Sequence, residues 1–360
     1  MRAGCTMSEV EDLARGMAAK TAVFDLPVGG AKGGIDFDRK DPPAPSVFWS
    51  GSVRRCARGW PRTGDRGGSG GVPQHLLDDV FARLGLQQSY HAAISRAEDP
   101  QGGTLRRVRA ALNAPVPSGF LLGDVIGGYG VAQACIGTVQ ACGWPQAETT
   151  VAIQGIGTMG GRRGLVSVRG RNARDCCRRR LGTLYCPDGL DVPALLDLRD
   201  GYGEIDRSRV PSHVQRLPSA AVIATEADIL VPAAISYAIT TDNVDQVAAK
   251  VVIEAANAAT TPCAEAVLTG RGIPVVPPDF VVNAGAVAWA WWVLLSQVGT
   301  DPEDSFLRLR TEMLAKVALL LGKWILDGVA PRQTAWDLVA DNRSAPAPAD
   351  SPAVPALTIP

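Results

Sequence analysis

Residues 149–160 read TTVAIQGIGTMG, a short apolar run followed at once by three spaced glycines. The run at 149–154 predicts a buried strand. The pattern G-x-G-x-x-G directly after a strand favours a dinucleotide site, in which Gly155 permits the tight turn and Gly157 lets the backbone approach a pyrophosphate. An ordinary glycine turn is the alternative. The candidate cofactor-binding residues of this motif are Gly155, Gly157, Thr158, Met159 and Gly160.

Apolar segments of alternating type continue on the carboxyl side of the motif. We expect strands at residues 227–231, 251–254 and 273–276, with helices between them at 232–239 and 262–269. Strands that alternate with helices imply a parallel sheet with helices on its faces. The predicted fold class is therefore α/β, with a Rossmann-like dinucleotide-binding domain.

Helices are also expected on both sides of this unit. Ser8 and Glu11 have the spacing of a capping box and predict a helix that ends near Phe24, because Pro27 disfavours helical residues before it. Residues 344–360 are rich in Pro and Ala and predict a flexible tail. Further helices are expected at residues 76–84, 131–142, 284–297, 303–326 and 334–341.

Two arginine-rich segments interrupt the pattern. Residues 161–180 hold eight arginines where a parallel α/β fold should show an apolar helix and strand, and residues 43–71 predict an irregular loop. An acidic residue about 20 positions after the glycines would hold a ribose hydroxyl, yet Asp175 does not follow a recognisable strand. A shifted reading frame over residues 43–96 and 161–180 would explain these arginine-rich segments. It predicts that the second strand of the sheet is lost.

Composition excludes several classes of function. Lys+Arg and Asp+Glu both total 36, so no net charge favours binding to nucleic acid or a membrane. The eight cysteines form no C-x-x-C pair and lie far in sequence from the three histidines, so we expect no metal site. The start of the chain lacks a signal-peptide core, and the longest apolar run, 284–295, is too short for a bilayer, so we expect a cytoplasmic protein.

Lysine is scarce, and two of the six lysines lie close together near the N-terminus. Lys32 stands among four glycines in LPVGGAKGGI at residues 26–35, where the phosphate-binding pattern G-x-x-x-x-G-K-[ST] is absent. Burial beside positive charge would lower the pKa of Lys32 and suit it to acid–base catalysis. Taken alone, Lys20 is best explained as a lysine that complements the dipole at the end of the first helix.

Ordered segments of the chain resemble the amino-acid dehydrogenase family that includes glutamate, leucine, phenylalanine and valine dehydrogenases. They occur in the family's order and cover most of the chain in patches. The segments are MAAKTA (17–22) followed by LPVGGAKGGI (26–35), VAIQGIGTMG (151–160), ADILVPAA (227–234), KVVIEAANAATTP (250–262) and PDFVVNAGAV (278–287).

The resemblance implies oxidative deamination of an L-amino acid, glutamate or a branched-chain or other aliphatic one, to the 2-oxo acid and ammonia, with NAD or NADP accepting hydride. It implies that Lys20 binds the substrate α-carboxylate and that Lys32 is the catalytic lysine. Asp99 is the candidate proton shuttle; an exposed loop carboxylate is the alternative. Asn257 would contact the nicotinamide ribose or carboxamide, and Asn283 the substrate or nicotinamide side, unless both merely cap or turn the chain.

The resemblance also implies a division into domains. Residues 1–122, with the helices at 301–343 packing back on them, would form a substrate-binding and oligomerisation domain. Residues 123–300 would form the NAD(P)-binding domain, with the active site in the cleft and a homo-oligomer as the assembly. The family carries an N-terminal segment with further substrate contacts before the part that matches here, so we expect a truncated first domain.

Two positions depart from the family pattern. Gly127 stands where the family usually has a threonine that helps to hold the nicotinamide. Ala290 stands where glutamate-specific members have serine, which favours an aliphatic substrate. The alternative function is a catalytically impaired or inactive relative that at most binds nucleotide or a partner subunit.

Overall fold

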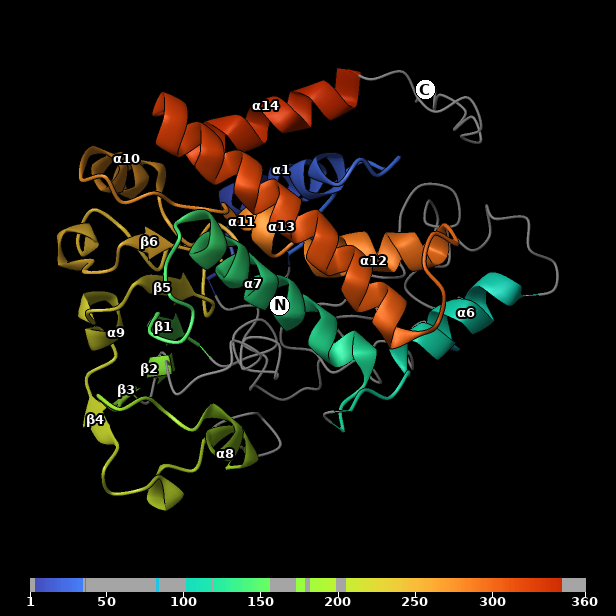
Figure 1. Cartoon of the computed structure of the whole chain (residues 1–360). Coiled ribbons are helices and arrows are strands. Elements are labelled where there is room, and N and C mark those ends of the chain that lie inside the picture. The colour runs from blue at the N-terminus through green and yellow to red at the C-terminus, as the bar shows by residue number, and fades with distance from the viewer. Residues whose placement is uncertain are drawn as a thin grey trace.

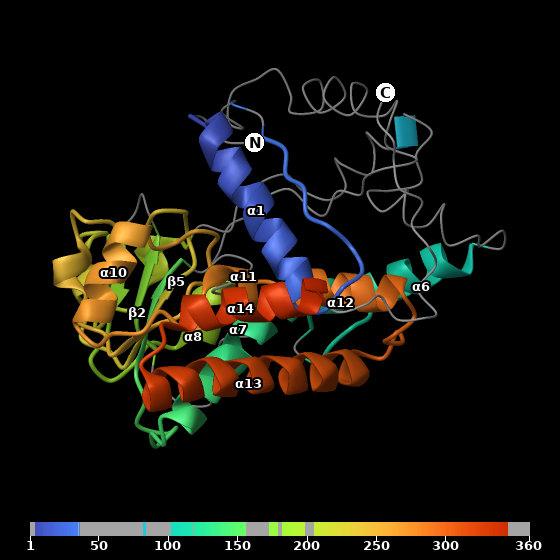
Figure 2. The same ribbon diagram turned by 90° about the horizontal axis from the view of Figure 1, so that it is seen from above.

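The computed structural model describes residues 4–34, 36, 82–83, 102–117, 119–155, 173–178, 182–198 and 205–344. Most of the helix expected at residues 76–84, the irregular loop expected at 43–71 and the tail after residue 344 lie outside these residues. The described part consists of a sheet with helices on both faces and a layer of long helices beside it (Figures 1 and 2).

The sheet has six strands in the order β4-β3-β2-β1-β5-β6. The neighbours β2, β1, β5 and β6 are parallel, whereas β3 and β4 are antiparallel additions at one edge. Val151 of β1 pairs with Ile229 of β5, which pairs in turn with Val251 of β6. The strands are β1 (Val151–Gln154), β2 (Ala173–Arg178), β3 (Gly182–Tyr185), β4 (Gln215–Leu217), β5 (Ile229–Pro232) and β6 (Val251–Val252).

Side chains on the central strands alternate between two hydrophobic cores. Val151, Ile153 and Ile229 belong to the core beneath the long helices, whereas Ala152 and Leu230 belong to the core on the opposite face. Successive strand residues point to opposite faces, so strands buried on both faces must be apolar throughout. This is why VAI and ILV are uninterrupted apolar runs.

The strands expected at residues 149–154, 227–231 and 251–254 are present but shorter. The strand expected at residues 273–276 is not formed as a strand. Residues 273–276 contribute a single bridge, Val275 to Val252. The helix expected at 232–239 is wrong. There the backbone N–H groups of Tyr237 and Ile239 donate to Ala258 and Ala259 at 2.7 and 3.0 Å, so the segment pairs with a neighbouring loop.

The second strand, which the reading-frame hypothesis predicts to be lost, is present. β2 lies within the arginine-rich segment and pairs in parallel with β1. Asp175, which the sequence did not place on a strand, lies inside β2 opposite Ala152 and Tyr185. Strand pairing uses backbone groups, so an open β1 edge accepts even an arginine-rich partner.

Helices cover the sheet and build the second layer. Helix α13 lies along α7, where Gly137 allows Leu314 and Val317 to approach closely. The long helices are α1 (Met7–Val23), α6 (Gly103–Leu112), α7 (Leu122–Ala141), α12 (Gly285–Leu294), α13 (Pro302–Asp327) and α14 (Pro331–Ser344). The short helices are α8 (Val192–Asp197), α9 (Ala221–Ala224), α10 (Pro262–Gly270) and α11 (Asp279–Val282). No helix among the described residues is both long and apolar enough to cross a membrane.

The first helix is capped by a different residue from the expected Ser8. The hydroxyl of Thr6 accepts from the backbone N–H of Glu9 at 3.2 Å, so the cap lies two residues earlier. Thr6 and Glu9 have the same spacing as Ser8 and Glu11, and the sequence alone does not choose between them. The helix ends at Val23 with Phe24 as its C-cap, as expected.

Two leucines on α13 provide a test of the packing between the long helices. Leu309 is fully buried, whereas Leu307 is 65% exposed. Leu309→Ala is expected to lower the free energy of unfolding by about 2–5 kcal/mol, because it leaves a cavity against α7 and α12. Leu307→Ala should change it by less than about 0.5 kcal/mol. Urea unfolding of both variants measures the difference, and equal effects would contradict this packing.

Candidate active site

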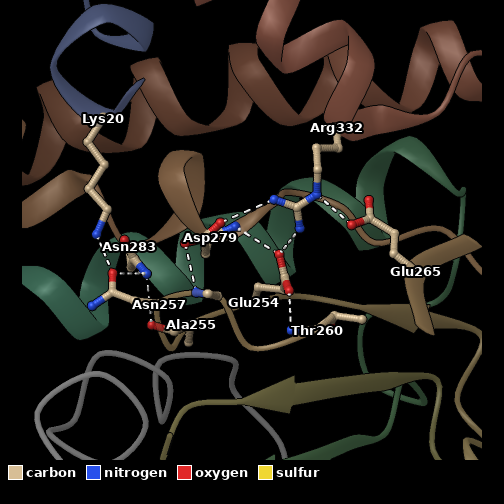
Figure 3. Close-up of polar contacts among 10 residues, drawn as sticks. Lys20, Glu254, Ala255, Asn257, Thr260, Glu265, Asp279, Asn283 and Arg332 are labelled. Carbon is tan, nitrogen blue, oxygen red and sulfur yellow. Dashed lines mark hydrogen bonds and ion pairs between the residues drawn. The ribbon is translucent and has the colours of Figure 1, made fainter. Parts of the chain in front are cut away.

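Three of the predicted site residues meet in one polar cluster (Figure 3). Lys20 lies in the last turn of α1 and is only 6% exposed. Its Nζ donates to Oδ1 of Asn257 at 2.5 Å, and Nδ2 of Asn283 donates to the same oxygen at 3.2 Å. Asn257 lies in the loop after β6, and Asn283 is the C-cap of α11. Lys20 thus points into the protein and does not extend into solvent at the end of its helix.

The cluster leaves an acceptor without a partner. Oδ1 of Asn283 is buried and has no hydrogen-bond partner among the described residues, although Nδ2 of Asn283 also donates to the carbonyl of Ala255 at 3.3 Å. Oε1 of Gln154, the last residue of β1, is buried and unpartnered in the same sense. Buried polar atoms are nearly always paired. These two unpaired oxygens near the carboxyl edge of the sheet therefore indicate a place where a ligand would donate hydrogen bonds.

The surroundings of Lys20 shift its protonation equilibrium towards the neutral amine. Burial lowers the pKa of Lys20 to about 8, Asp279 partly opposes this, and Lys32 adds to it. A lysine beside one carboxylate and another lysine, with most of its hydration removed, is poised to exchange its proton near neutral to alkaline pH.

Lys32 is positioned by glycine packing against the same helix. The chain turns back after α1, and a Cβ on Gly30 would stand 2.0 Å from the backbone nitrogen of Ala18, so only glycine fits. Thr21 also donates its hydroxyl to the carbonyl of Gly29 at 3.5 Å. The side chain of Lys32 keeps contact with solvent, and partial burial lowers its pKa. Both lysines are thus placed by α1.

A second cluster, which sequence reasoning missed, lies directly beside the first. Arg332 of α14 makes ion pairs with Glu254, with Glu265 at 2.5 Å and with Asp279 at 3.3 Å. Glu254 is fully buried, and burial raises its pKa, as it does that of Glu265. The surrounding carboxylates raise the pKa of Arg332 despite its burial. The sequence signal was a glutamate directly after an apolar strand.

The carboxylates of this second cluster hold the loop that carries Asn257. Glu254 accepts from the backbone N–H of Thr260 at 2.7 Å and of Asp279 at 3.1 Å. Asp279 accepts from the backbone N–H of Ala258 at 2.9 Å. Ala258 has a φ of 47°, a left-handed conformation that is unfavourable for alanine. The loop after β6 is therefore held in a strained conformation that presents Asn257 to Lys20.

The glycine motif is described only at its first residue. Gly155 has a φ of 99°, and a Cβ on it would stand 2.8 Å from the Cβ of Ala234. This close approach of the turns after β1 and β5 lies beside a cavity lined in part by Gln154 and Ile223. The carboxyl edge of a parallel sheet is where dinucleotides bind, so the described residues fit such a group. The predicted residues Gly157, Thr158, Met159 and Gly160, and also Asp99, lie outside the described residues.

The described residues contain no group of His, Cys, Asp and Glu side chains suited to hold a metal ion. The three carboxylates around Arg332 already have a cation in the guanidinium group.

Adjacent glycines test the packing of the Lys32 loop. Gly30→Ala is expected to lower the free energy of unfolding by about 1–3 kcal/mol, because its methyl group would overlap the backbone of α1. Gly29→Ala, whose methyl group meets open space, should change it by less than about 0.5 kcal/mol. Urea denaturation compares the two, and a harmless Gly30→Ala would show that the loop is not held against α1.

Burial of Lys20 predicts a pH dependence of stability. Its pKa is about 8 in the folded chain and 10.5 for a lysine in water, so between these values the unfolded chain binds more protons. The Lys20 contribution therefore makes stability rise as pH increases from about 8 to 10.5. At pH 7, Lys20→Met is expected to raise the free energy of unfolding by about 3 kcal/mol.

Denaturant unfolding of both proteins across pH 7–10.5 isolates this contribution, because all other titrating groups are shared. The advantage of Lys20→Met should shrink steadily above pH 8. A difference that does not change with pH would show that the Lys20 amine is not buried.

Comparisons with known proteins agree with this architecture. The family model described as Glutamate/Leucine/Phenylalanine/Valine dehydrogenase matches residues 119–313, and a second family model, described as Glu/Leu/Phe/Val dehydrogenase, dimerisation domain, matches residues 1–48. The chain is 29% identical over 300 residues to the NADP-specific glutamate dehydrogenase of Synechocystis sp. and 30% identical over 310 residues to a catabolic NAD-specific glutamate dehydrogenase of Bacillus subtilis. These alignments cover 80% of this chain and 66% and 65% of the two relatives, so the chain spans just under two thirds of their length.

Solved structures share the fold. The hetero-hexameric glutamate dehydrogenase of Thermus thermophilus superposes with a TM-score of 0.71 at 24% identity, over 94% of this chain and 78% of that one. The glutamate dehydrogenase of Plasmodium falciparum gives 0.73 at 17% identity, over 94% and 74% of the two chains. The fold is that of glutamate dehydrogenases, a dimerisation domain followed by an NAD(P)-binding domain, and the chain belongs to the Glu/Leu/Phe/Val dehydrogenase family.

Proposed function

We propose that this protein catalyses the NAD(P)-dependent oxidative deamination of an L-amino acid to its 2-oxo acid and ammonia. The observation that carries the proposal is the buried Lys20, whose Nζ donates to Oδ1 of Asn257, an oxygen that also accepts from Asn283, with Lys32 on the adjoining loop. A buried lysine with a lowered pKa destabilises the fold, so its presence is better explained by chemistry than by packing. The named relatives are NAD- or NADP-specific glutamate dehydrogenases, which supports the same reaction class.

Lys20, Lys32 and Asp99 each have a role in the proposed reaction. Lys20 binds the substrate α-carboxylate. This carboxylate takes the place of the Asn257 carboxamide as the acceptor for the Lys20 amine. Lys32, whose pKa is lowered, exchanges a proton with the reacting centre and activates water for attack on the imine. Asp99 shuttles the proton of the amino group.

The remaining residues hold the cofactor and orient the substrate. Asn257 and the unpartnered Oδ1 of Asn283 contact the nicotinamide and the substrate. Gly155, whose φ of 99° allows the turn directly after β1, begins the glycine motif that would take the pyrophosphate. When bound, NAD or NADP accepts the hydride from the substrate α-carbon.

The substrate side chain is either a carboxylate, as in glutamate, or an aliphatic group. Ala290 is half-buried on the apolar helix α12, three residues after Val287. An apolar residue at this position has no donor for a side-chain carboxylate, which favours an aliphatic substrate. The named relatives are glutamate dehydrogenases, which favours glutamate as the substrate.

A domain division and an assembly accompany this proposal. We infer that residues 1–122 with helices from 301–343 form the substrate-binding and oligomerisation domain, and that 123–300 form the NAD(P)-binding domain. A homo-oligomer in the cytoplasm is the proposed assembly, in keeping with the match of residues 1–48 to a dimerisation-domain family.

One observation favours a second candidate, a catalytically impaired relative that binds nucleotide or a partner subunit. Eight arginines occupy residues 161–180, directly after the start of the glycine motif. Charged side chains in an apolar helix position would weaken the nucleotide domain.

Turnover distinguishes the two candidates. We expect the folded chain to reduce NAD or NADP at alkaline pH with at least one of leucine, valine, phenylalanine and glutamate. Lys32→Ala should lower kcat/KM by about 100-fold or more, because it removes the acid–base group. Lys323→Ala is the matched control, since Lys323 pairs with Asp327 on the exposed face of α13. Absence of turnover with all four amino acids and both cofactors from well-folded protein would favour the impaired relative.

A further inference from the structure

Helix α14 presents one face to the rest of the molecule along its whole length. Ala335 is fully buried and Val339 is 5% exposed, three and seven residues after Arg332. With 3.6 residues per turn, Arg332, Ala335, Val339 and Arg343 fall within one stripe of the helix. Polar groups at both ends of α14 therefore face the same neighbours as its apolar centre.

The first end of α14 contacts the loop that carries the two asparagines. Arg332 binds Glu254, which accepts from Thr260, and Asp279, which accepts from Ala258 (Figure 3). Thr260 and Ala258 lie on the carboxyl side of Asn257 in its loop, and Asp279 begins the helix that ends at Asn283. Through these carboxylates, the guanidinium group of Arg332 holds the backbone segments that carry Asn257 and Asn283.

The second end of α14 contacts the helix that carries Lys20. Nδ2 of Asn342 donates to the carbonyl of Ala22 at 2.9 Å, and Nη2 of Arg343 donates to the carbonyl of Ala18 at 3.0 Å. These carbonyls lie two residues after and two residues before Lys20. Figure 2 shows the carboxyl end of α1 meeting α14, in agreement with the contacts between the two helices.

We propose that α14 is a strut that sets the position of Lys20 against Asn257 and Asn283, with Arg332 at one end and Asn342 and Arg343 at the other as positioning residues. Asn342 lies ten positions after Arg332, which is a rise of about 15 Å along a rigid helix. Because α14 is held by directional hydrogen bonds at both ends, it fixes the distance between α1 and the segments that carry Asn257 and Asn283. The strut concerns geometry alone, and only its consequence for catalysis rests on the proposed function.

Apolar packing offers a competing explanation. Helix α1 also packs directly against α11, so these contacts could place Lys20 without help from α14. The two explanations differ in one respect. Contacts between apolar side chains tolerate sliding, whereas the bonds of Asn342 and Arg343 to two carbonyls of α1 do not.

The test loosens the second end of the strut and observes Lys20 directly. Asn342 is half-buried and Arg343 is exposed, so Asn342→Ala combined with Arg343→Ala should leave the chain folded. Brief acylation of lysines at a series of pH values, followed by peptide mass spectrometry, gives the pH at which Lys20 is half-reactive. We expect this midpoint near pH 8 in the unaltered chain and about one pH unit higher in the double variant, because Lys20 regains water.

Matched controls exclude general effects. Gln333→Ala removes a side-chain bond to Asp337 on the exposed face of α14 and should leave the Lys20 midpoint unchanged. Lys323, 54% exposed on its side chain, provides an internal reference in every sample. Arg332→Lys, which retains charge but loses the fork that spans several carboxylates, should shift the midpoint in the same direction as the double variant.

An unchanged Lys20 midpoint in the folded double variant overturns the strut and assigns the spacing to packing between α1 and α11. The result does not depend on turnover. A shifted midpoint in a chain that turns over no amino acid would support the strut and contradict the proposed function. An unchanged Lys20 midpoint in the double variant, together with turnover of an amino acid by the unaltered chain, would support the proposed function and contradict the strut. Should Arg332→Lys fail to fold, the double variant alone decides.

Discussion

The ion pair between Glu254 and Arg332 is the interaction on which the rest of the site depends. Glu254 is fully buried at the end of β6, so its charge is tolerated only because a guanidinium group and two backbone N–H groups face it. Those two N–H groups belong to the loop after β6 and to the start of α11. A single carboxylate thus joins the sheet edge, the Asn257 loop, the Asn283 helix and α14.

The lysine cluster shows the opposite balance of energies. Burial of Lys20 lowers its pKa and opposes folding, since the carboxylate that counteracts this effect, Asp279, is shared with Arg332. The carboxylates of the second cluster hold the loop after β6 in its strained conformation, and this loop presents Asn257 to Lys20. Two neighbouring clusters, one favourable and one costly, are what a site requires when its functional groups must be held where they would not otherwise lie.

The sequence predicted those features that depend on local pattern. The apolar run before Gly155 forms β1, and the periodic segment at 303–326 forms α13, because short-range periodicity reports which faces are buried. The helix expected at 232–239 failed because its N–H groups bond to a loop about twenty residues away. Arg332 was missed for the same reason, since its partners lie 53–78 residues distant and no local pattern marks an arginine as buried.

Three departures from local rules lie close together in the fold. Ala258 adopts a left-handed conformation, Gly30 approaches the backbone of α1, and Lys20 is buried, and all three lie at one junction between α1 and the loop after β6. A sequence that served folding alone would avoid each of them. Their meeting where helix α1 packs against the sheet edge supports the proposed placement of the active site at this junction. This support comes from the packing of the chain itself and does not depend on the resemblance to dehydrogenases.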